Sequence, residues 1–181
     1  MPMHYAELDE KTRAIMLSEF AAEQAGGNPY LSKGLSTHGK TVFPQLLRDA
    51  IRHGTEVSLA ATLADANLWE PMETYVRESV SRERKRNIQQ SSERLATTEF
   101  STWYVRGLAR RLMDEGVMKC QVYRGAQPKW EPGECVKHEG LMLDVKTVYD
   151  NHRVRYWPEP GNKEALSIPL APGCPHVIKR V

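Results

Sequence analysis

Apolar residues in the first half of the chain recur at helical spacing, and helix-breaking residues separate the periodic stretches. Residues 6–25 predict a first helix, which the breaker cluster at 26–29 ends. Residues 28–40 are typical of an ordered loop. A second helix is expected from about 42 to 53, and Thr55 resembles the N-cap of a short third one. The N-terminal region is therefore predicted to be helical.

The longest helical stretch is expected over residues 72–115. Apolar residues at steps of three, four and seven mark one face in its second part: Ile88, Leu95, Ala96, Phe100, Trp103, Tyr104, Leu108 and Leu112. We interpret the aromatic members of this face as core residues. Gly116 is expected to end the helix as its C′ residue.

Beyond Gly116 the pattern changes to the alternation of a β-strand. Met118, Cys120 and Val122 alternate with polar residues, so Cys120 is interpreted as a core residue rather than a ligand. A further strand is expected at 166–170. Glycine and proline are frequent from residue 125 onward, and so short a loop-rich segment buries little apolar area. We therefore expect an additional source of stability in this part of the chain.

Two short motifs suggest that a zinc ion supplies it. Cys135 and His138 are separated by two residues and followed by Gly140, which permits a tight reversal, and Cys174 and His176 form a second pair. Four such ligands give the closed tetrahedral coordination of a structural zinc site. His152 is an alternative fourth ligand, and the competing interpretation is that these are unrelated core cysteines and surface histidines.

Together these patterns predict an α+β fold, in which a helical N-terminal region and a long helix precede a small, loop-rich β module stapled by zinc. The expected organisation is a helical arm or docking region at 1–80, a long connecting helix at 81–116 and a β/zinc-knuckle module at 117–181.

Composition limits the function classes. The chain has 181 residues, a formal net charge of +2 and three cysteines, which do not suggest a disulfide framework. No apolar run approaches the roughly 20 residues of a membrane span, and charged residues follow the start closely, so neither a membrane segment nor a secretory signal is expected. The expected location is the cytoplasm, or a particle that is assembled there. No phosphate-binding glycine loop or nuclease spacing appears, and we expect neither catalysis nor a small-molecule substrate.

A basic run between residues 82 and 86 contains Arg82, Arg84, Lys85 and Arg86. Several cations on one helix can contact nucleic-acid phosphates without reading bases. Acidic residues interrupt the run, however, and a solvated helix face with charges of both signs is the favoured interpretation.

The order of features in residues 90–181 resembles the phage Mu F-like minor head protein family. The resemblance rests on Ala96-Thr-Thr-Glu99, the helix to Gly116-Val, Trp130, Cys135-x2-His138-x-Gly140 and Pro-Gly-Cys174-Pro-His176. His138 stands where the family usually has its second cysteine, Ala171 where it has a histidine, and Pro175 where it has an arginine.

The resemblance implies a structural, non-enzymatic role in a tailed-phage or prophage particle. It implies protein partners at the portal or capsid, a part in head morphogenesis and localisation in the virion. The alternative function is a zinc-containing nucleic-acid-binding module, related to nucleases, that contacts DNA through the basic 82–111 helix.

Overall fold

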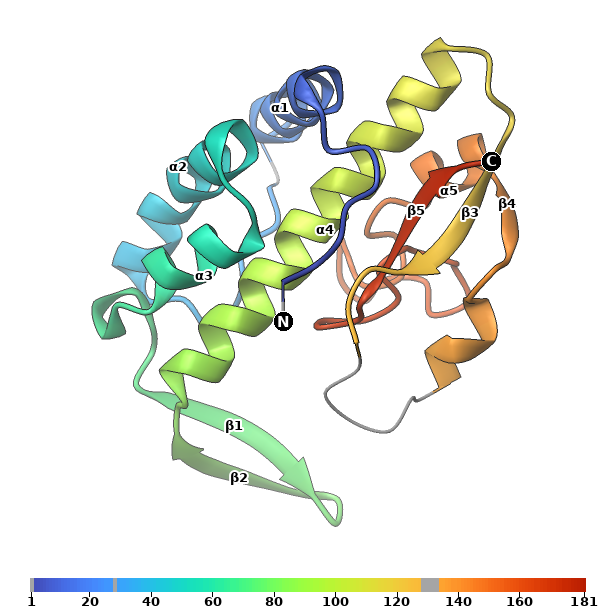
Figure 1. Ribbon diagram of the computed structural model, residues 1–181. Helices are drawn as coiled ribbons and strands as arrows, with labels where there is room; N and C mark the ends of the chain where they lie inside the picture. Colours follow the sequence, from blue (N-terminus) through green and yellow to red (C-terminus); the bar gives the residue numbers. More distant parts are fainter. Residues whose placement is uncertain (1, 28, 128–133) are drawn as a thin grey trace.

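The computed structural model describes residues 2–27, 29–127 and 134–181, except for the side chains of residues 134 and 135, and shows an α+β fold (Figure 1). The helices are α1 (Glu10–Ala25), α2 (Thr37–His53), α3 (Glu56–Leu63), α4 (Ile88–Asp114) and α5 (Val145–Asp150), with short 3-10 helices at Ala66–Leu68 and Glu134–His138. The strands are β1 (Met72–Arg77), β2 (Val80–Lys85), β3 (Lys119–Arg124), β4 (Met142–Asp144) and β5 (His176–Arg180).

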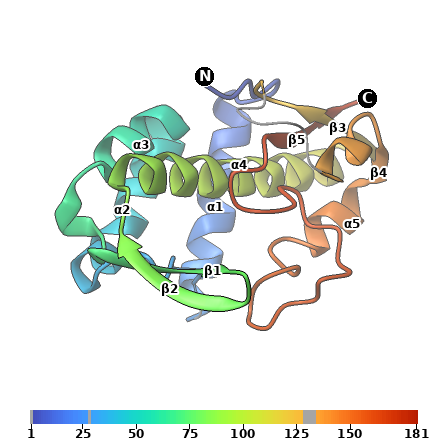
Figure 2. The ribbon, with the colours of Figure 1, turned by 90° about the horizontal axis from the view of Figure 1, so that it is seen from below.

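Helix α4 runs through the middle of the molecule. Helices α1, α2 and α3 lie on one side of it, and the sheet with α5 lies on the other (Figures 1 and 2). Phe100, Trp103 and Leu108 of the predicted apolar face are fully buried. Buried side chains from both sides join them in one core, which includes Met16 of α1 and Ile178 of β5. None of the helices in the described part of the chain has the length and apolar character needed to cross a bilayer.

Local signals set several helix ends where the sequence predicts them. The Thr55 hydroxyl caps α3 by accepting from the Val57 N–H. Gly116 has φ +73°, and the Val117 N–H donates to the Leu112 carbonyl at 2.8 Å, which completes a Schellman motif. The second helix begins earlier than expected, because the Ser36 side chain caps it from within the segment interpreted as a loop.

The three-stranded sheet has the order β4-β3-β5, and both pairings are antiparallel. Cys120 is fully buried at its centre, which confirms the core assignment, and burial raises the pKa of its thiol to about 11. The predicted strand at 166–170 is wrong. Pro169 there lacks an N–H for a ladder, and the strand near the C-terminus that pairs with β3 is β5, at His176–Arg180.

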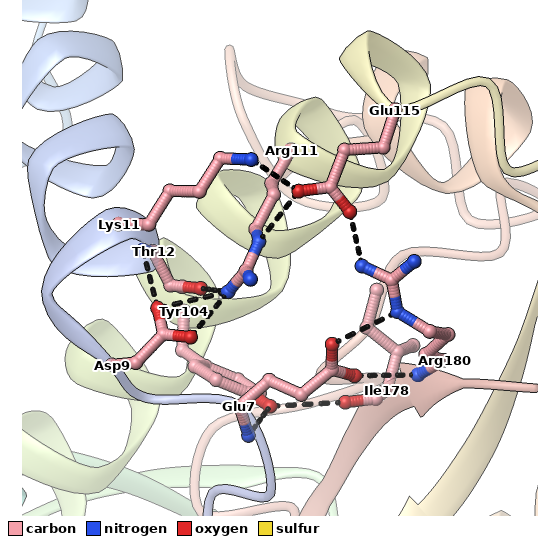
Figure 3. A network of polar contacts seen from close by, with 9 residues as sticks. All are labelled: Glu7, Asp9, Lys11, Thr12, Tyr104, Arg111, Glu115, Ile178 and Arg180. Carbon is pink, nitrogen blue, oxygen red and sulfur yellow. Dashed lines mark hydrogen bonds and ion pairs between the residues drawn. The ribbon is translucent and has the colours of Figure 1, made fainter.

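The outer edge of β5 is covered by groups from elsewhere in the chain. The Arg180 N–H donates to the Glu7 carboxylate at 2.7 Å, and the Ile178 carbonyl accepts from the Tyr104 hydroxyl at 3.3 Å. Arg180 also pairs with Glu115 at the end of α4 (Figure 3). These contacts connect the N-terminal segment, the central helix and the last strand.

The long helix predicted over 72–115 is wrong in its first part, because residues 72–85 form an antiparallel hairpin and α4 starts at Ile88. Thr74, Val76 and Val80 favour extended structure. Glu78 and Ser79 make the turn with φ values of 53° and 64°, without the glycine or asparagine that usually identifies such a turn. The Asn87 side chain then caps α4 through the Gln90 N–H.

Candidate metal centre

Cys174 and His176 lie side by side at the start of β5. His176 is the first residue of the strand, and Cys174 stands two positions before it. The Cys174 Sγ is 3.2 Å from the His176 Nδ1, and both residues are buried. The loop that carries Cys174 is attached to the central helix, because the Gly173 N–H donates to the Thr98 hydroxyl at 2.8 Å. The predicted second half-site is therefore a formed pair of one sulfur and one imidazole nitrogen.

Glu139 links this pair to the segment of the first half-site. Its carboxylate lies 2.9 Å from the His176 Nε2 and is also bound by Arg124. The hydrogen bond from His176, supported by Arg124, holds the pKa of Glu139 below its usual value. When Nε2 carries the proton that this carboxylate accepts, the lone pair of Nδ1 faces Cys174. This is the orientation that a carboxylate imposes on metal-binding histidines.

The first half-site forms a turn beside β3. Gly140 has φ +79°, as a tight reversal requires, and its N–H donates to the Val122 carbonyl at 2.9 Å. The His138 Nδ1 is buried and has no hydrogen-bond partner within the described part of the chain. The side chain of the predicted ligand Cys135, like Trp130, lies outside what the structure describes.

The donor set suits zinc in its chemistry. A thiol facing an imidazole, a carboxylate behind that imidazole and an unpartnered imidazole nitrogen on the neighbouring turn are groups that zinc sites use. Among the described residues, no three His, Cys, Asp or Glu side chains converge closely enough to hold a metal. The structure thus brings together two of the four predicted ligands.

His152, the alternative ligand, belongs to a different cluster. Its ring lies 5.0 Å from that of Trp103, and its Nε2 is 3.5 Å from the Glu23 carboxylate. Burial lowers the pKa of His152 to about 3. The adjacent Arg153 forms a buried bidentate pair with Glu99 of α4, at 2.9 and 2.8 Å. These contacts fix the segment after α5 to α1 and α4.

The basic run lies on β2 and the residue after it, so no cationic helix face extends from 82 to 111. Arg86 is held at the base of the hairpin, where it donates to the Glu70 and Met72 carbonyls. Arg84 pairs with Glu73 at 2.7 Å. On α4, three arginines are engaged in ion pairs with carboxylates: Arg106 with Glu19, Arg110 with Asp114 and Arg111 with Asp9.

Sequence reasoning missed Glu139 and Arg124 as parts of the site. Glu139 directly follows the predicted ligand His138, and this position next to a ligand was the available signal. Arg124 carries no such signal, because only the antiparallel pairing of β3 with β5 sets it opposite His176.

Comparison with known proteins gives the chain no relatives: no family model, no curated protein and no solved structure matches it.

Proposed function

We propose that this chain is a structural or assembly protein of a tailed-phage or prophage particle, and that a zinc ion staples its C-terminal half. The observation that carries the proposal is the contact of Cys174 with His176, whose other ring nitrogen reaches Glu139 on the turn of the first half-site. The motifs of residues 90–181 that resemble the phage Mu F-like minor head proteins support the particle role.

In this proposal the zinc ligands are Cys135, His138, Cys174 and His176. A bound zinc ion supplies structural cross-linking between two loops that are distant in sequence. Structural zinc sites contribute roughly 10 kcal/mol or more of apparent binding free energy, which appears as folding stability. Metal binding would therefore stabilise the β module against unfolding.

The partners are protein components of the particle, at the portal or the capsid. The helices of residues 1–80 are the proposed docking region, since they form the layer on the opposite side of α4 from the sheet (Figure 1). The role requires no bond-making or bond-breaking step.

Metal analysis of the purified chain tests the zinc site. We expect about one zinc per chain, as a closed structural site holds. Cys135→Ser and Cys174→Ser should each lose most of it. Cys120→Ser is the matched control, because Cys120 is buried in the sheet on the core side and is not among the proposed ligands. Equal zinc content in all four proteins would refute the site.

Co-purification tests the particle role separately. The tagged chain should retain portal or capsid proteins when they are expressed together, and genes for these proteins or for a terminase should neighbour its own. Failure to bind any of them, with a full zinc content, would reject the particle role and leave the zinc site in place.

A further inference from the structure

The β1–β2 hairpin projects from the body of the molecule below α3 and the start of α4 in the view of Figure 1. Figure 2 shows it from the side on which it projects. Both strands are largely exposed along their length. The hairpin is fixed at its base, where the Arg86 guanidinium donates to two backbone carbonyls and lies 5.7 Å from the Trp69 ring. An isolated two-stranded hairpin is marginally stable in water. Such a projecting element is therefore suited to contact with a partner.

The register of the hairpin separates its charges. One face, here called the cationic face, carries Glu73, Tyr75, Arg77, Val80, Arg82 and Arg84. The opposite face carries Met72, Thr74, Val76, Ser81, Glu83 and Lys85. The cationic face thus has three arginines and one glutamate, and this glutamate is already engaged by Arg84 and Arg86. The opposite face has one charge of each sign.

The three arginines are available to differing degrees. Arg82 is exposed and has no ion-pair partner within the described residues, and Arg77 meets the exposed Glu78 at 3.6 Å. The Arg84 guanidinium lies 5.1 Å from the centre of the Tyr75 ring, in a cation–π contact. Arg82 and Arg84 project from the same face of one strand at a spacing of roughly 7 Å. Three arginines therefore follow one another along an exposed ribbon, and two of them also meet a carboxylate.

We propose that the cationic face binds the phosphate backbone of a nucleic-acid duplex, without base recognition. A two-stranded β-ribbon has the width that the major groove admits. Arginine is the side chain best matched to phosphate, because its planar guanidinium donates two parallel hydrogen bonds. The apolar and aromatic side chains on this face are those of Tyr75 and Val80, and half of its residues are arginines. The centre of a protein–protein interface, in contrast, is depleted of charged residues. Polar, positively charged surfaces are typical of contacts with nucleic acid.

Fluorescence anisotropy of a labelled duplex of mixed sequence, titrated with the full-length chain at several salt concentrations, tests the proposal. Contacts of Arg77 and Arg82 with phosphates predict a slope of about −2 for log K against log[salt], and a contact of Arg84 in exchange for its pair with Glu73 would bring the slope to about −3. Arg77→Glu with Arg82→Glu should reduce the slope by about two and weaken binding roughly tenfold or more. Arg77→Lys with Arg82→Lys keeps the charge and should keep most of the affinity, which distinguishes lost charge from a disturbed hairpin.

The matched control is Lys85→Glu with Lys163→Glu. It makes the same change in net charge, on the opposite face of the hairpin and on the exposed loop after α5. It should leave most of the affinity intact. A loss equal to that of the arginine pair would overturn the assignment to the cationic face, and so would absence of salt-dependent binding by the wild type. Tighter binding of polyglutamate than of duplex at the same salt would identify an acidic protein as the partner and reject nucleic acid. None of these outcomes depends on zinc.

Discussion

At the scale of single residues, Glu139 controls the orientation of His176. The carboxylate accepts from Nε2 and leaves Nδ1 directed at Cys174. Glu139→Gln keeps the shape of the side chain but removes its charge. At the proposed zinc site, this change should lower the affinity for zinc by roughly 10- to 100-fold, the usual effect of removing such an orienting partner. Competition with a chromophoric chelator measures the change.

Glu164→Gln is the control for this measurement, because Glu164 is exposed on the loop after α5 and has no side-chain ion pair in the described part of the chain. Its zinc affinity should match that of the wild type. If Glu139→Gln binds zinc as tightly as Glu164→Gln, the carboxylate plays no part in positioning the imidazole.

We expect His152 to make the free energy of unfolding depend on pH. Its folded pKa of about 3 is below the value of 6.5 that it has in an unfolded chain. Between pH 6.5 and pH 3 the unfolded chain binds a proton at this imidazole that the folded chain excludes, which favours unfolding. The contribution of neutral His152 to the free energy of unfolding is therefore complete above pH 6.5 and is lost progressively toward pH 3. Glu23 faces the imidazole and favours protonation, whereas burial, Arg153 and Arg106 oppose it.

We expect the free energy of unfolding to depend more steeply on pH in the wild type than in His152→Gln. Between pH 6 and 4.5, the free energy of unfolding of the wild type should fall with an additional slope of up to about 1.4 kcal/mol per pH unit, one proton's worth. Urea unfolding at several pH values measures both slopes. Parallel curves for the two proteins would mean that His152 is protonated in the folded state.

The residue patterns reveal part of this site. The Cys174–His176 pair could be predicted because one residue separates the two. The role of Glu139 could not, because it depends on a hydrogen bond across 37 positions. The environment of His152 was equally hidden, since Glu23 and Trp103 reach it from two other helices.

At the scale of elements, α1 and α4 cross closely at Gly107. A Cβ added there would lie 3.0 Å from the Met16 backbone nitrogen and 3.1 Å from its Cα, atoms that cannot move without shifting α1. Alanine normally favours a helix over glycine by about 1 kcal/mol. Here we expect Gly107→Ala to destabilise the protein by roughly 1–3 kcal/mol, the usual cost of overpacking. Thermal or urea unfolding measures it.

Gly26→Ala provides the comparison. Gly26 caps α1 with φ −67°, and an added Cβ there meets carbonyl oxygens of α1 at 3.4 Å and beyond, an ordinary contact. This variant should be neutral or slightly more stable. A Gly107→Ala protein as stable as Gly26→Ala would mean that α1 moves away from α4 at little cost.

The elements that the sequence did not reveal share a physical cause. The β1–β2 hairpin has a turn of Glu78 and Ser79 at positive φ, and these residues do not indicate a reversal. Strand β5 follows three prolines within a few residues, and its place in the sheet depends on β3, which lies more than fifty positions earlier. Caps and apolar periodicity are local signals, and they were sufficient for α1, α3 and the apolar face of α4.

At the scale of the whole molecule, one core connects the segments predicted as arm, connecting helix and β module. The α+β class was predictable from the change of periodicity at Gly116, but the sharing of α4 by both layers was not. The contacts of Glu7 with Arg180 and of Tyr104 with Ile178 add polar links across this core (Figure 3).

We therefore expect the two layers to unfold together. Native-state hydrogen exchange should give the slowest amides of β3 and those of α3 similar opening free energies, close to that of global unfolding. Exchange of β3 at a clearly lower free energy, with α3 still protected, would instead show a β module that opens independently.

The covered edge of β5 also has a consequence that we expect to see between copies of the protein. A bare strand edge is a template on which further strands can grow into fibrils. Glu7 and Tyr104 occupy the hydrogen-bonding groups that such growth at the C-terminal strand would use. Reversing this protection, by Glu7→Ala with Tyr104→Phe, would convert an ordered strand into a starting point for aggregation.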